Sequence, residues 1–348
     1  MRPGVTTVEE HPMTPDNAGG PGRILELIMA FYGSRAVLSA VELGLFSTLA
    51  GRSMTAAELS DQAGLHPRGA TDFLDALVSL GLLERTGDSY ANTPDAERHL
   101  VAGKPGYVGG YARMAAGMLF PVWGKLTEAL RTGQAQVPSG RGIFDGYRDD
   151  DATRGFLGAM DAVNSGVGAA LVSVFDWSRY SSVVDLGGAR GNLAATLLRE
   201  HPHLDATCFD LPPVERFFAE HTAELGLAGR IRFVAGDFFA DPLPAADVFV
   251  AGHILHYFDL PARQRLLARV HEAVKPGGAV LVYDRMIDAD RRGRPLSLLG
   301  SLNMLLTSPG GSEYTPVEAR KWLTEAGFGT VEVASVGALD TLVIGHKD

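Results

Sequence analysis

Hydrophobic residues follow two different patterns along the chain. From residue 21 to about residue 178 they recur at helical spacing, whereas from residue 181 short β-branched runs alternate with helical stretches. The first pattern begins with a strongly apolar segment over 21–50, and a water-soluble protein must bury such a surface, for which a partner subunit is one candidate. Residues 1–20 are polar and rich in Pro and Gly, which predicts a flexible tail.

Residues 53–94 have the pattern of a winged helix. The stretches 53–64 and 66–83 predict two helices, and 82–94 predicts two short strands around a Gly87-Asp88 turn. The second helix carries Asp72 and Asp75 against a single Arg68, so it would repel DNA phosphates. We therefore predict that a winged-helix-like unit over 21–105 serves dimerisation and walls the substrate site, and that a helical region over 106–178 follows it.

The second pattern predicts an α/β unit over 179–348. Helical stretches such as 194–201 and 261–274 separate the first five expected strands, which is the pattern of a doubly wound, Rossmann-like parallel sheet. The last two expected strands lack a connection of helix length, so they should form a hairpin. The expected strands are 181–188, 205–211, 231–237, 247–255, 279–287, 330–336 and 341–347.

Charge and composition limit the classes of partner that the chain is expected to bind. A formal net charge of −10 argues against a broad surface for nucleic acid or anionic membranes, which leaves small molecules as the expected partners. The single cysteine, Cys208, excludes an internal disulfide and a cysteine-based zinc cluster. The chain has neither a signal-peptide core nor a run of 18 apolar residues, so we predict a cytoplasmic protein with no membrane partner.

The stretch VVDLGGARGNLA, residues 183–194, predicts a strand, a tight turn and the start of a helix, which together suit a nucleotide. The dinucleotide pattern G-x-G-x-x-G fails here, because Ala189 and Asn192 stand where its second and third glycines belong. The chain contains no phosphate-binding P-loop, no H-E-x-x-H zinc motif and no G-x-S-x-G nucleophile turn. We predict no metal site.

Seven motifs in the same order resemble the S-adenosylmethionine-dependent class I small-molecule O-methyltransferases, which include caffeic acid, acetylserotonin and bacterial natural-product enzymes. They are DLGGARG, FDLP, GDFF, HILHYFD, KPGG, SLNMLL and PGGSEYT. The resemblance covers the chain from about residue 22. It implies a Rossmann-like methyltransferase sheet behind an all-helical, winged-helix-like dimerisation domain. It further implies a homodimer, S-adenosylmethionine as cofactor with S-adenosylhomocysteine as product, and a role in natural-product or antibiotic biosynthesis.

The resemblance implies a cofactor site along the carboxyl ends of the strands. Asp185 suits the cationic methionine end, and the glycines after it let the backbone approach the cofactor closely. Asp210 ends the second strand, where other doubly wound folds bind ribose hydroxyls, although it is also placed to cap the turn before Pro212. Asp237 and Phe238 resemble the pair that contacts adenine. The expected cofactor-binding residues are Asp185, Gly187, Gly188, Asp210, Leu211, Asp237, Phe238, Gly252 and Phe258.

The resemblance also implies a general base. His256 matches the family's histidine, with His253 as its rival, and Tyr257 stands where most members have an acidic residue. Asp284 and Glu313 match the acidic residues that orient the base, because either can accept the imidazole N–H and fix the tautomer.

The expected acceptor is a hydroxyl of an aromatic or polyketide-type small molecule. Its binding residues are expected to be Tyr147, Phe156, Met160, Asn164, Asn303 and Met304. Three alternatives stay open: C- or N-methylation, non-transfer chemistry such as hydroxylation or decarboxylation on the same fold, and a winged-helix regulator that senses a ligand.

Overall fold

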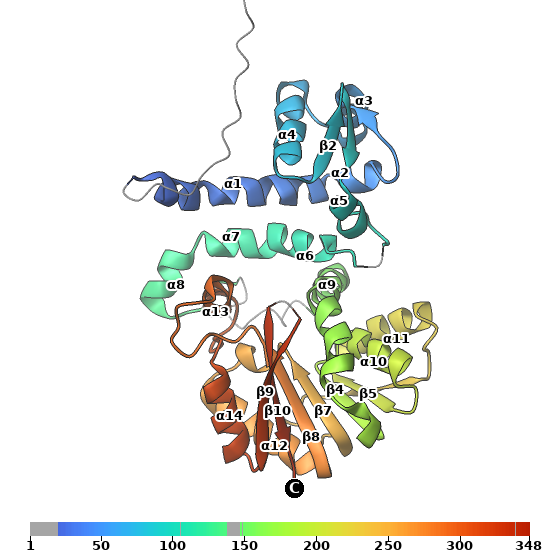
Figure 1. Cartoon of the computed structure of the whole chain (residues 1–348), viewed down its shortest axis with the longest axis vertical. Coiled ribbons are helices and arrows are strands. Elements are labelled where there is room, and N and C mark those ends of the chain that lie inside the picture. Colours follow the sequence, from blue (N-terminus) through green and yellow to red (C-terminus); the bar gives the residue numbers. More distant parts are fainter. Residues whose placement is uncertain (1–19, 105, 138–146, 148, 338) are drawn as a thin grey trace, which may run out of the picture.

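A computed structural model describes residues 20–348 except 105, 138–146, 148 and 338. The predicted flexible tail over 1–20 therefore lies, apart from Gly20, outside the described residues. Figure 1 shows a small helical unit, a layer of helices beneath it, and an α/β unit with a central sheet.

The N-terminal unit packs short helices and a small sheet against the second half of a long helix. Thr55 and Glu58 form a reciprocal capping box that fixes the start of α3. Asp75 of α4, an acidic residue of the presumed DNA-reading helix, is bound to Arg85 at 2.8 Å and accepts the Tyr90 hydroxyl at 2.7 Å. The elements are α1 (Gly22–Glu42), α2 (Leu45–Thr48), β1 (Met54–Thr55), α3 (Ala56–Ala63), α4 (Pro67–Ser79), β2 (Leu83–Thr86), β3 (Ser89–Asn92) and α5 (Pro94–His99), with sheet order β1-β3-β2.

The middle layer lies between the N-terminal unit and the sheet (Figure 1). Residues 109–123 run as one helical segment with a π-helical turn, η1 (Ala115–Leu119), at its centre. Gly110 packs so closely on α9 that a Cβ there would lie 2.9 Å from the Gly158 carbonyl oxygen. The elements are α6 (Gly109–Met114), η1, α7 (Phe120–Trp123), α8 (Leu126–Thr132) and α9 (Asp150–Val174).

The C-terminal unit is built on a seven-stranded sheet of order β6-β5-β4-β7-β8-β10-β9, parallel except for β10. The strand order reverses between β4 and β7, and ligands bind at such a point in doubly wound folds. The strands are β4 (Ser182–Leu186), β5 (Asp205–Asp210), β6 (Ile231–Ala235), β7 (Ala246–Gly252), β8 (Val274–Asp284), β9 (Thr330–Val336) and β10 (Asp340–His346). The helices are η3 (Trp177–Arg179), α10 (Asn192–Glu200), η4 (Pro212–Val214), α11 (Glu215–Glu224), η5 (Leu255–Tyr257), α12 (Leu260–Ala273), α13 (Pro295–Thr307) and α14 (Pro316–Glu325).

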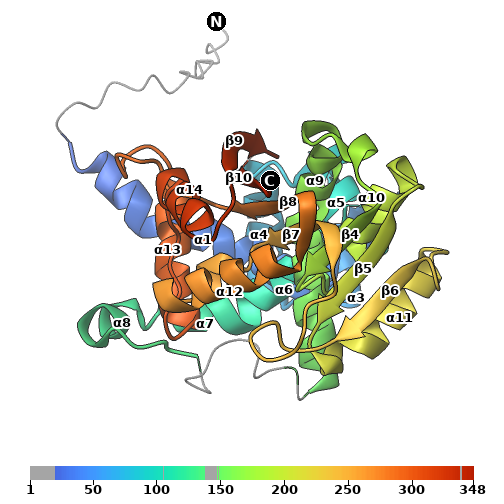
Figure 2. The ribbon, with the colours of Figure 1, turned by 90° about the horizontal axis from the view of Figure 1, so that it is seen from below.

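Each face of the sheet carries its own hydrophobic core. Leu171 of α9 and Leu197 of α10 pack with one face, whereas Leu266 of α12 and Trp322 of α14 pack with the other. Seen from below, α9 and α10 lie on one side of the sheet and α12 and α14 on the other (Figure 2). The predicted doubly wound fold is confirmed, and so is the hairpin of the last two strands.

Two local differences from the prediction have physical reasons. The strand expected over 247–255 ends at Gly252, because His253 has φ 52°, a left-handed backbone conformation that is incompatible with a β-strand. The N-terminal unit is mostly helical but also contains the two-residue strand β1, which is too short to leave a hydrophobic pattern.

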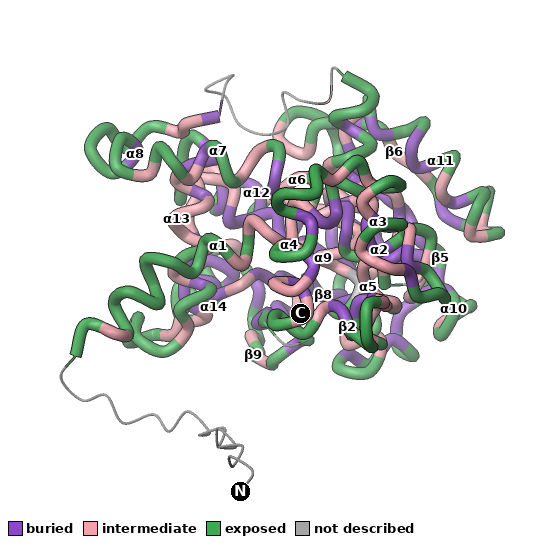
Figure 3. Tube along the Cα trace, turned by 90° about the horizontal axis from the view of Figure 1, so that it is seen from above, coloured by how far each residue is buried: buried purple, intermediate pink, exposed green. Residues whose placement is uncertain are grey.

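Helix α1 exposes much of its apolar surface (Figure 3). Within the described residues it is the one helix that by itself is long and apolar enough to cross a membrane, and 11% of its most apolar window is buried. Its exposed side chains are Ile24, Leu25, Leu27, Ile28, Met29, Phe31 and Tyr32. Such a surface requires a cover, either a partner chain or a lipid.

Candidate active site

Two neighbouring cavities lie at the carboxyl ends of the parallel strands. The first, of about 260 Å³, surrounds the turn after β4, and we name it the glycine-turn cavity. The second, of about 230 Å³, lies between the middle layer, η5 and α13, and we name it the His256 cavity. Four residues line both cavities and so form the wall between them: Phe156, Met160, His253 and Tyr257.

The glycines of the first cavity are required by close approaches. A Cβ on Gly188 would lie 2.8 Å from an Asp185 carboxylate oxygen and 2.8 Å from the Cys208 sulfur. Gly187 has φ 66°, and a Cβ on Gly252 would enter the Tyr283 ring. The packing of the chain's own side chains around this cavity therefore requires glycine at these positions.

Two buried carboxylates, Asp185 and Asp210, line the glycine-turn cavity. Asp210 accepts the backbone N–H of Ala189 at 2.8 Å and that of Leu211 at 2.7 Å. Burial raises the pKa of Asp210 to about 6, against the pull of these two N–H groups. Burial, with a smaller contribution from Asp210, raises the pKa of Asp185 to about 8. A cationic ligand would therefore find a carboxylate whose ionised form it stabilises.

Aromatic rings also line this cavity, among them Phe238 and Phe258. Phe238 meets Phe258 edge to face, with ring centroids 5.8 Å apart. Asp237 holds the loop, because one of its carboxylate oxygens accepts the Phe239 N–H at 2.8 Å. All nine residues expected to bind the cofactor line this cavity, so one group with a cationic end, a ribose and an adenine fits the donors and the rings present.

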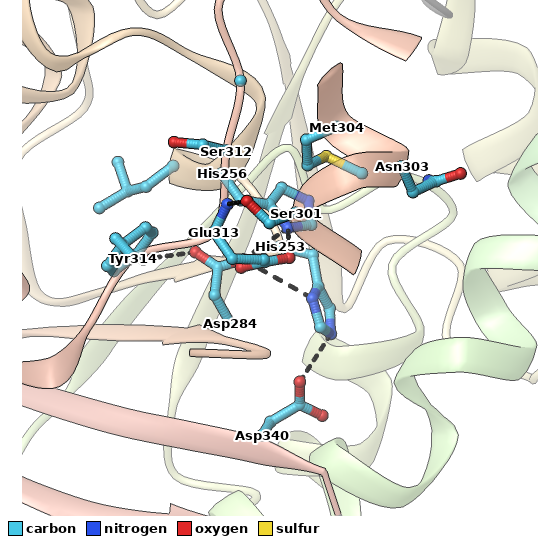
Figure 4. Close-up of polar contacts among 12 residues, drawn as sticks. His253, His256, Asp284, Ser301, Asn303, Met304, Ser312, Glu313, Tyr314 and Asp340 are labelled. Carbon is cyan, nitrogen blue, oxygen red and sulfur yellow. Dashed lines mark hydrogen bonds and ion pairs between the residues drawn. The ribbon is translucent and has the colours of Figure 1, made fainter. Parts of the chain in front are cut away.

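His256 lies in the second cavity with its ring held by two carboxylates (Figure 4). Its Nδ1 is 2.8 Å from Glu313 Oε1 and 3.3 Å from Asp284 Oδ1. The other Asp284 oxygen accepts the Tyr314 hydroxyl. With Nδ1–H donated to Glu313, the Nε2 lone pair is left for a ligand, as a general base requires.

The short helix η5 and the loop over 309–315 hold this pair of groups together. Ser312 N–H donates to the His256 carbonyl at 2.9 Å, and Gly311 is so close that a Cβ there would lie 2.5 Å from the same oxygen. Arg263 of α12 donates to the Leu255 carbonyl at 2.9 Å and to the Ser312 hydroxyl at 3.0 Å. The position of His256 is therefore fixed by contacts among η5, the loop over 309–315 and α12.

The carboxylates set the protonation of His256. Burial lowers its pKa, but the charges of Asp284 and Glu313 and the hydrogen bond to Glu313 outweigh burial, so the pKa of His256 is raised above its ordinary value. Burial also raises the pKa of Asp284, so the histidine and this carboxyl titrate as a pair.

His253 has a different environment. Its Nδ1 lies 3.7 Å from Asp284 and its Nε2 lies 3.6 Å from Asp340, both too far for a hydrogen bond, so Nε2 has no hydrogen-bond partner among the described residues (Figure 4). Burial, helped by His256 and Arg285, lowers the pKa of His253 well below its ordinary value. His253 is therefore neutral and, unlike His256, is not held by a carboxylate.

Three of these side chains also approach one another as metal ligands do. His253, His256 and Asp284 offer atoms within 4.8 Å of one another. Glu313 already occupies His256 Nδ1, however, and Tyr314 already donates to Asp284. The absence of a metal stays a prediction.

The structure divides the expected acceptor residues between the cavities. Tyr147 and Asn164 line the glycine-turn cavity, Phe156 and Met160 line both, and Asn303 and Met304 line the His256 cavity. Both asparagine amides are engaged: Asn164 accepts the Tyr283 hydroxyl at 3.1 Å, and Asn303 accepts the Trp123 indole N–H at 3.0 Å. Four of the six expected acceptor residues therefore line the cavity that contains the base.

Sequence reasoning did not place several residues in the site. Tyr257, noted only as a departure from the family, lies in the shared wall. Arg285, which directly follows the predicted Asp284, lines the His256 cavity, and Arg263 anchors the base from outside. None of these carries a sequence signal of its own, because each depends on which segments meet in space.

Comparison with known proteins identifies both halves of the chain. Residues 25–102 match the O-methyltransferase dimerisation domain, and residues 123–329 match the O-methyltransferase domain. The chain is 65% identical to the tetracenomycin polyketide synthesis 8-O-methyl transferase TcmO of Streptomyces glaucescens, over 96% of this chain and 99% of that protein. It is 40% identical to the N,N-dimethyltransferase OxyT of Streptomyces rimosus, over 93% and 96%.

Solved structures agree with these matches. Human N-acetylserotonin methyltransferase in complex with SAM aligns with a TM-score of 0.88 at 30% identity, over 96% of this chain and 99% of that chain. The mitomycin 7-O-methyltransferase MmcR aligns with a TM-score of 0.81 at 29% identity, over 93% and 97%. The chain therefore belongs to the O-methyltransferase family, and it is an S-adenosylmethionine-dependent O-methyltransferase.

Proposed function

We propose that His256 is the general base for a phenolic hydroxyl held in the His256 cavity. The observation that carries this proposal is the ring held at Nδ1 by Glu313, at 2.8 Å, with Nε2 left free of any described residue. His256 takes the hydroxyl proton on Nε2, so that the acceptor oxygen can form its bond to carbon, and Glu313 with Asp284 stabilises the imidazolium that results. When bound, S-adenosylmethionine supplies a methyl group on a positively charged sulfur.

We propose that the cofactor occupies the glycine-turn cavity. Asp185 would face the cationic methionine end, Asp210 the ribose hydroxyls, and Asp237 with Phe238 the adenine. Because Phe156, Met160, His253 and Tyr257 border both cavities, the reacting groups would meet beside these four side chains. Holding both reactants in this position is expected to supply much of the rate.

The proposed acceptor is an aromatic or polyketide-derived phenol. Relatives support this class, since the name of TcmO places it in polyketide synthesis and another relative, 34% identical, is a 3-hydroxy-5-methyl-1-naphthoate 3-O-methyltransferase. The wall of the His256 cavity agrees, because eight of its nineteen lining residues are methionine, phenylalanine, tyrosine or tryptophan, whose side chains suit a flat ring system. The asparagines at 164 and 303 are proposed to shape the walls rather than to change partners.

A mixed acceptor panel tests this proposal. The protein is incubated with S-adenosylmethionine and a set of naphthols, hydroxyanthraquinones and matched aromatic amines, and methylated products are identified by mass spectrometry. We expect O-methyl ethers of phenols. Products methylated only on nitrogen or carbon would instead favour chemistry like that in the name of the relative OxyT.

The pH dependence of turnover should reveal how the carboxylates around His256 shift the pKa of this histidine. Protonated His256 cannot accept a proton, so kcat/KM should rise with pH through the pKa of His256, which lies above its ordinary value. Glu313→Gln removes a negative charge 2.8 Å away, which lowers the pKa of His256, so the acidic limb should move to lower pH while the plateau rate falls.

The measurement uses a phenol with a pKa of about 10, whose own ionisation lies far from the limb. Glu325→Gln, an exposed change on α14, serves as the control and should leave the limb in place. A limb that does not move in Glu313→Gln would show that another group controls it.

We propose a homodimer in which α1 is covered by the partner. The dimerisation match over 25–102 includes α1, and this supports a protein partner over a lipid for its apolar surface. Ile28→Asp, at a side chain that is 61% exposed in the single chain, should convert the protein to a monomer, because a buried unpaired charge costs several kcal/mol.

Leu130→Asp is the matched control, since Leu130 on α8 is also 61% exposed. Light scattering at micromolar protein should give the dimer mass for the wild type and Leu130→Asp and the monomer mass for Ile28→Asp. A monomeric wild type would contradict the proposal.

The remaining partner and location assignments stay predictions. A cytoplasmic protein without nucleic-acid or membrane partners agrees with the acidic composition and with the engaged Asp75. The division into units at about residues 105 and 178 is likewise proposed.

A further inference from the structure

Arg285 contributes a positive charge to the His256 cavity. It follows Asp284 directly, where β8 ends, and Met286 N–H donates to the Asp284 carbonyl at 2.8 Å, which bends the chain at this point. Among the described residues that line either cavity, Arg285 is the only lysine or arginine.

Arg285 is half-buried as a residue, yet its guanidinium makes no hydrogen bond or ion pair with any described residue. Other partly buried arginines of the chain are engaged: Arg263 donates to the Leu255 carbonyl and Arg190 pairs with Asp161. None of its nitrogens is buried without a hydrogen-bond partner, so its donors remain accessible and can bind a partner that arrives from the cavity.

The nearest candidate partner within the protein does not fill this role. Asp340, at the start of β10, is buried, and its Oδ1 has no hydrogen-bond partner among the described residues. Arg285 acts on it only through space: burial raises the pKa of Asp340 to about 6, and the charge of Arg285 works in the opposite direction. The two side chains do not come within ion-pair distance, so the donors of Arg285 stay available.

The position of Arg285 relates this charge to the reaction. His256, Glu313 and Arg285 line the same cavity, so an acceptor whose hydroxyl faces His256 lies within the field of the guanidinium. The planar fork of arginine matches two oxygens of a carboxylate, and it also binds a single aromatic oxyanion.

We propose that Arg285 binds an anionic oxygen group of the acceptor, either a ring carboxylate or an ionised hydroxyl, and so selects acidic aromatic acceptors. This inference rests on the proposed phenol-binding function of the His256 cavity. Arg285 is in this view a specificity-determining residue, whereas the proton transfer stays with His256.

The test measures binding without turnover, on the full chain saturated with S-adenosylhomocysteine. The probes are 3-hydroxy-2-naphthoate, a nitronaphthol that is ionised at the assay pH, and neutral 2-naphthol. Arg285→Gln should raise the Kd of at least one anionic probe by roughly 10- to 100-fold, as expected for the loss of a charged hydrogen-bond donor, and change that of 2-naphthol less than about threefold. The Kd of Arg285→Lys for that probe should lie between those of the wild type and Arg285→Gln, because lysine keeps the positive charge but lacks the two parallel donors of the guanidinium.

The pattern of losses identifies the anion. A loss confined to the naphthoate indicates a carboxylate, a loss confined to the nitronaphthol indicates an ionised hydroxyl, and both outcomes support the proposal. Arg199→Gln, an exposed change on α10, should leave all three values unchanged. An equal loss for all three probes, or no loss for any, would overturn the proposal.

Turnover separates this inference from the proposed function. If wild-type protein methylates 2-naphthol and the anionic probes equally well, with the same rates in Arg285→Gln, the phenol-methylating function stands and the role of Arg285 fails. If wild-type protein binds the anionic probes through Arg285 but methylates no phenol, the role of Arg285 stands and the phenol-methylating function fails.

Discussion

Replacing His256 should reduce kcat by a factor on the order of 10²–10⁴ while the affinity for S-adenosylhomocysteine stays nearly unchanged. The separation follows from the structure, because His256 lines the acceptor cavity and does not belong to the described lining of the glycine-turn cavity. His256→Asn is the better variant, since its amide can still donate to Glu313, whereas His256→Ala leaves Glu313 and Asp284 buried without that partner.

The decisive measurement is a series of phenols of graded pKa with wild type and His256→Asn. The loss should shrink as the phenols become more acidic, because an acceptor that is already ionised needs no base. Asp284→Asn should act in the same direction but more weakly, by loosening the orientation of the ring. An equal reduction of kcat across the series would mean that His256 only maintains the structure of the site. No reduction of kcat would mean that His256 is not the base, and the neutral His253 would be tested next.

Asp210→Ala should weaken the binding of S-adenosylhomocysteine by about 1.5–3 kcal/mol for each charged hydrogen bond to the ribose, roughly 10- to 100-fold per bond. The measurement is calorimetry at pH 8, above the pKa of about 6 that burial gives Asp210, so that the carboxylate is ionised in the wild type. Asp205→Ala, at the exposed start of the same strand, is the control and should bind normally.

The structure shows a second role for Asp210 that this experiment must separate. Asp210 accepts the backbone N–H groups of Ala189 and Leu211, so its removal also loosens the turn. A 2′-deoxyribose analogue of S-adenosylhomocysteine resolves the two effects. If Asp210 binds the ribose, the analogue should bind the wild type more weakly than the parent compound, and Asp210→Ala should no longer distinguish them. Equal discrimination in both proteins would leave Asp210 as a turn residue only.

The parts of the site that could be predicted from sequence are those formed within one segment. Asp185 and the glycines after it lie in a single strand-turn-helix stretch, so β-branched residues followed by Gly-rich spacing suffice to find them. The general base and its two carboxylates lie on three separate segments, and only the order of several motifs brought them together in advance.

The parts that sequence could not predict depend on where long helices pass. Phe156, Met160 and Asn164 follow one another at intervals of four, the spacing of one helical face, but this spacing does not reveal that the face spans two cavities. Asn164 therefore lines the glycine-turn cavity and accepts the Tyr283 hydroxyl, which the sequence did not indicate. The end of β7 at Gly252 depends on a single backbone angle at His253. Arg285 follows a residue whose role was predicted, yet its exposure to the cavity is a property of the packed fold.

The π-helical turn over Ala115–Leu119 bears on how acceptor range can diverge among relatives. Such a turn holds one residue more than an α-helical turn, and it lies between Met114 and Trp123, which both line the His256 cavity. A substitution here alters one side chain, whereas loss of a single residue that restores α-helical geometry would redirect the side chains within the turn while the helix on either side keeps its phase. Met118 and Leu119, which lie in this turn and line the His256 cavity, would then be displaced together. Length variation in this short segment is thus a route by which duplicated genes could acquire a new acceptor pocket in one step, with the base and the cofactor cavity left as they are.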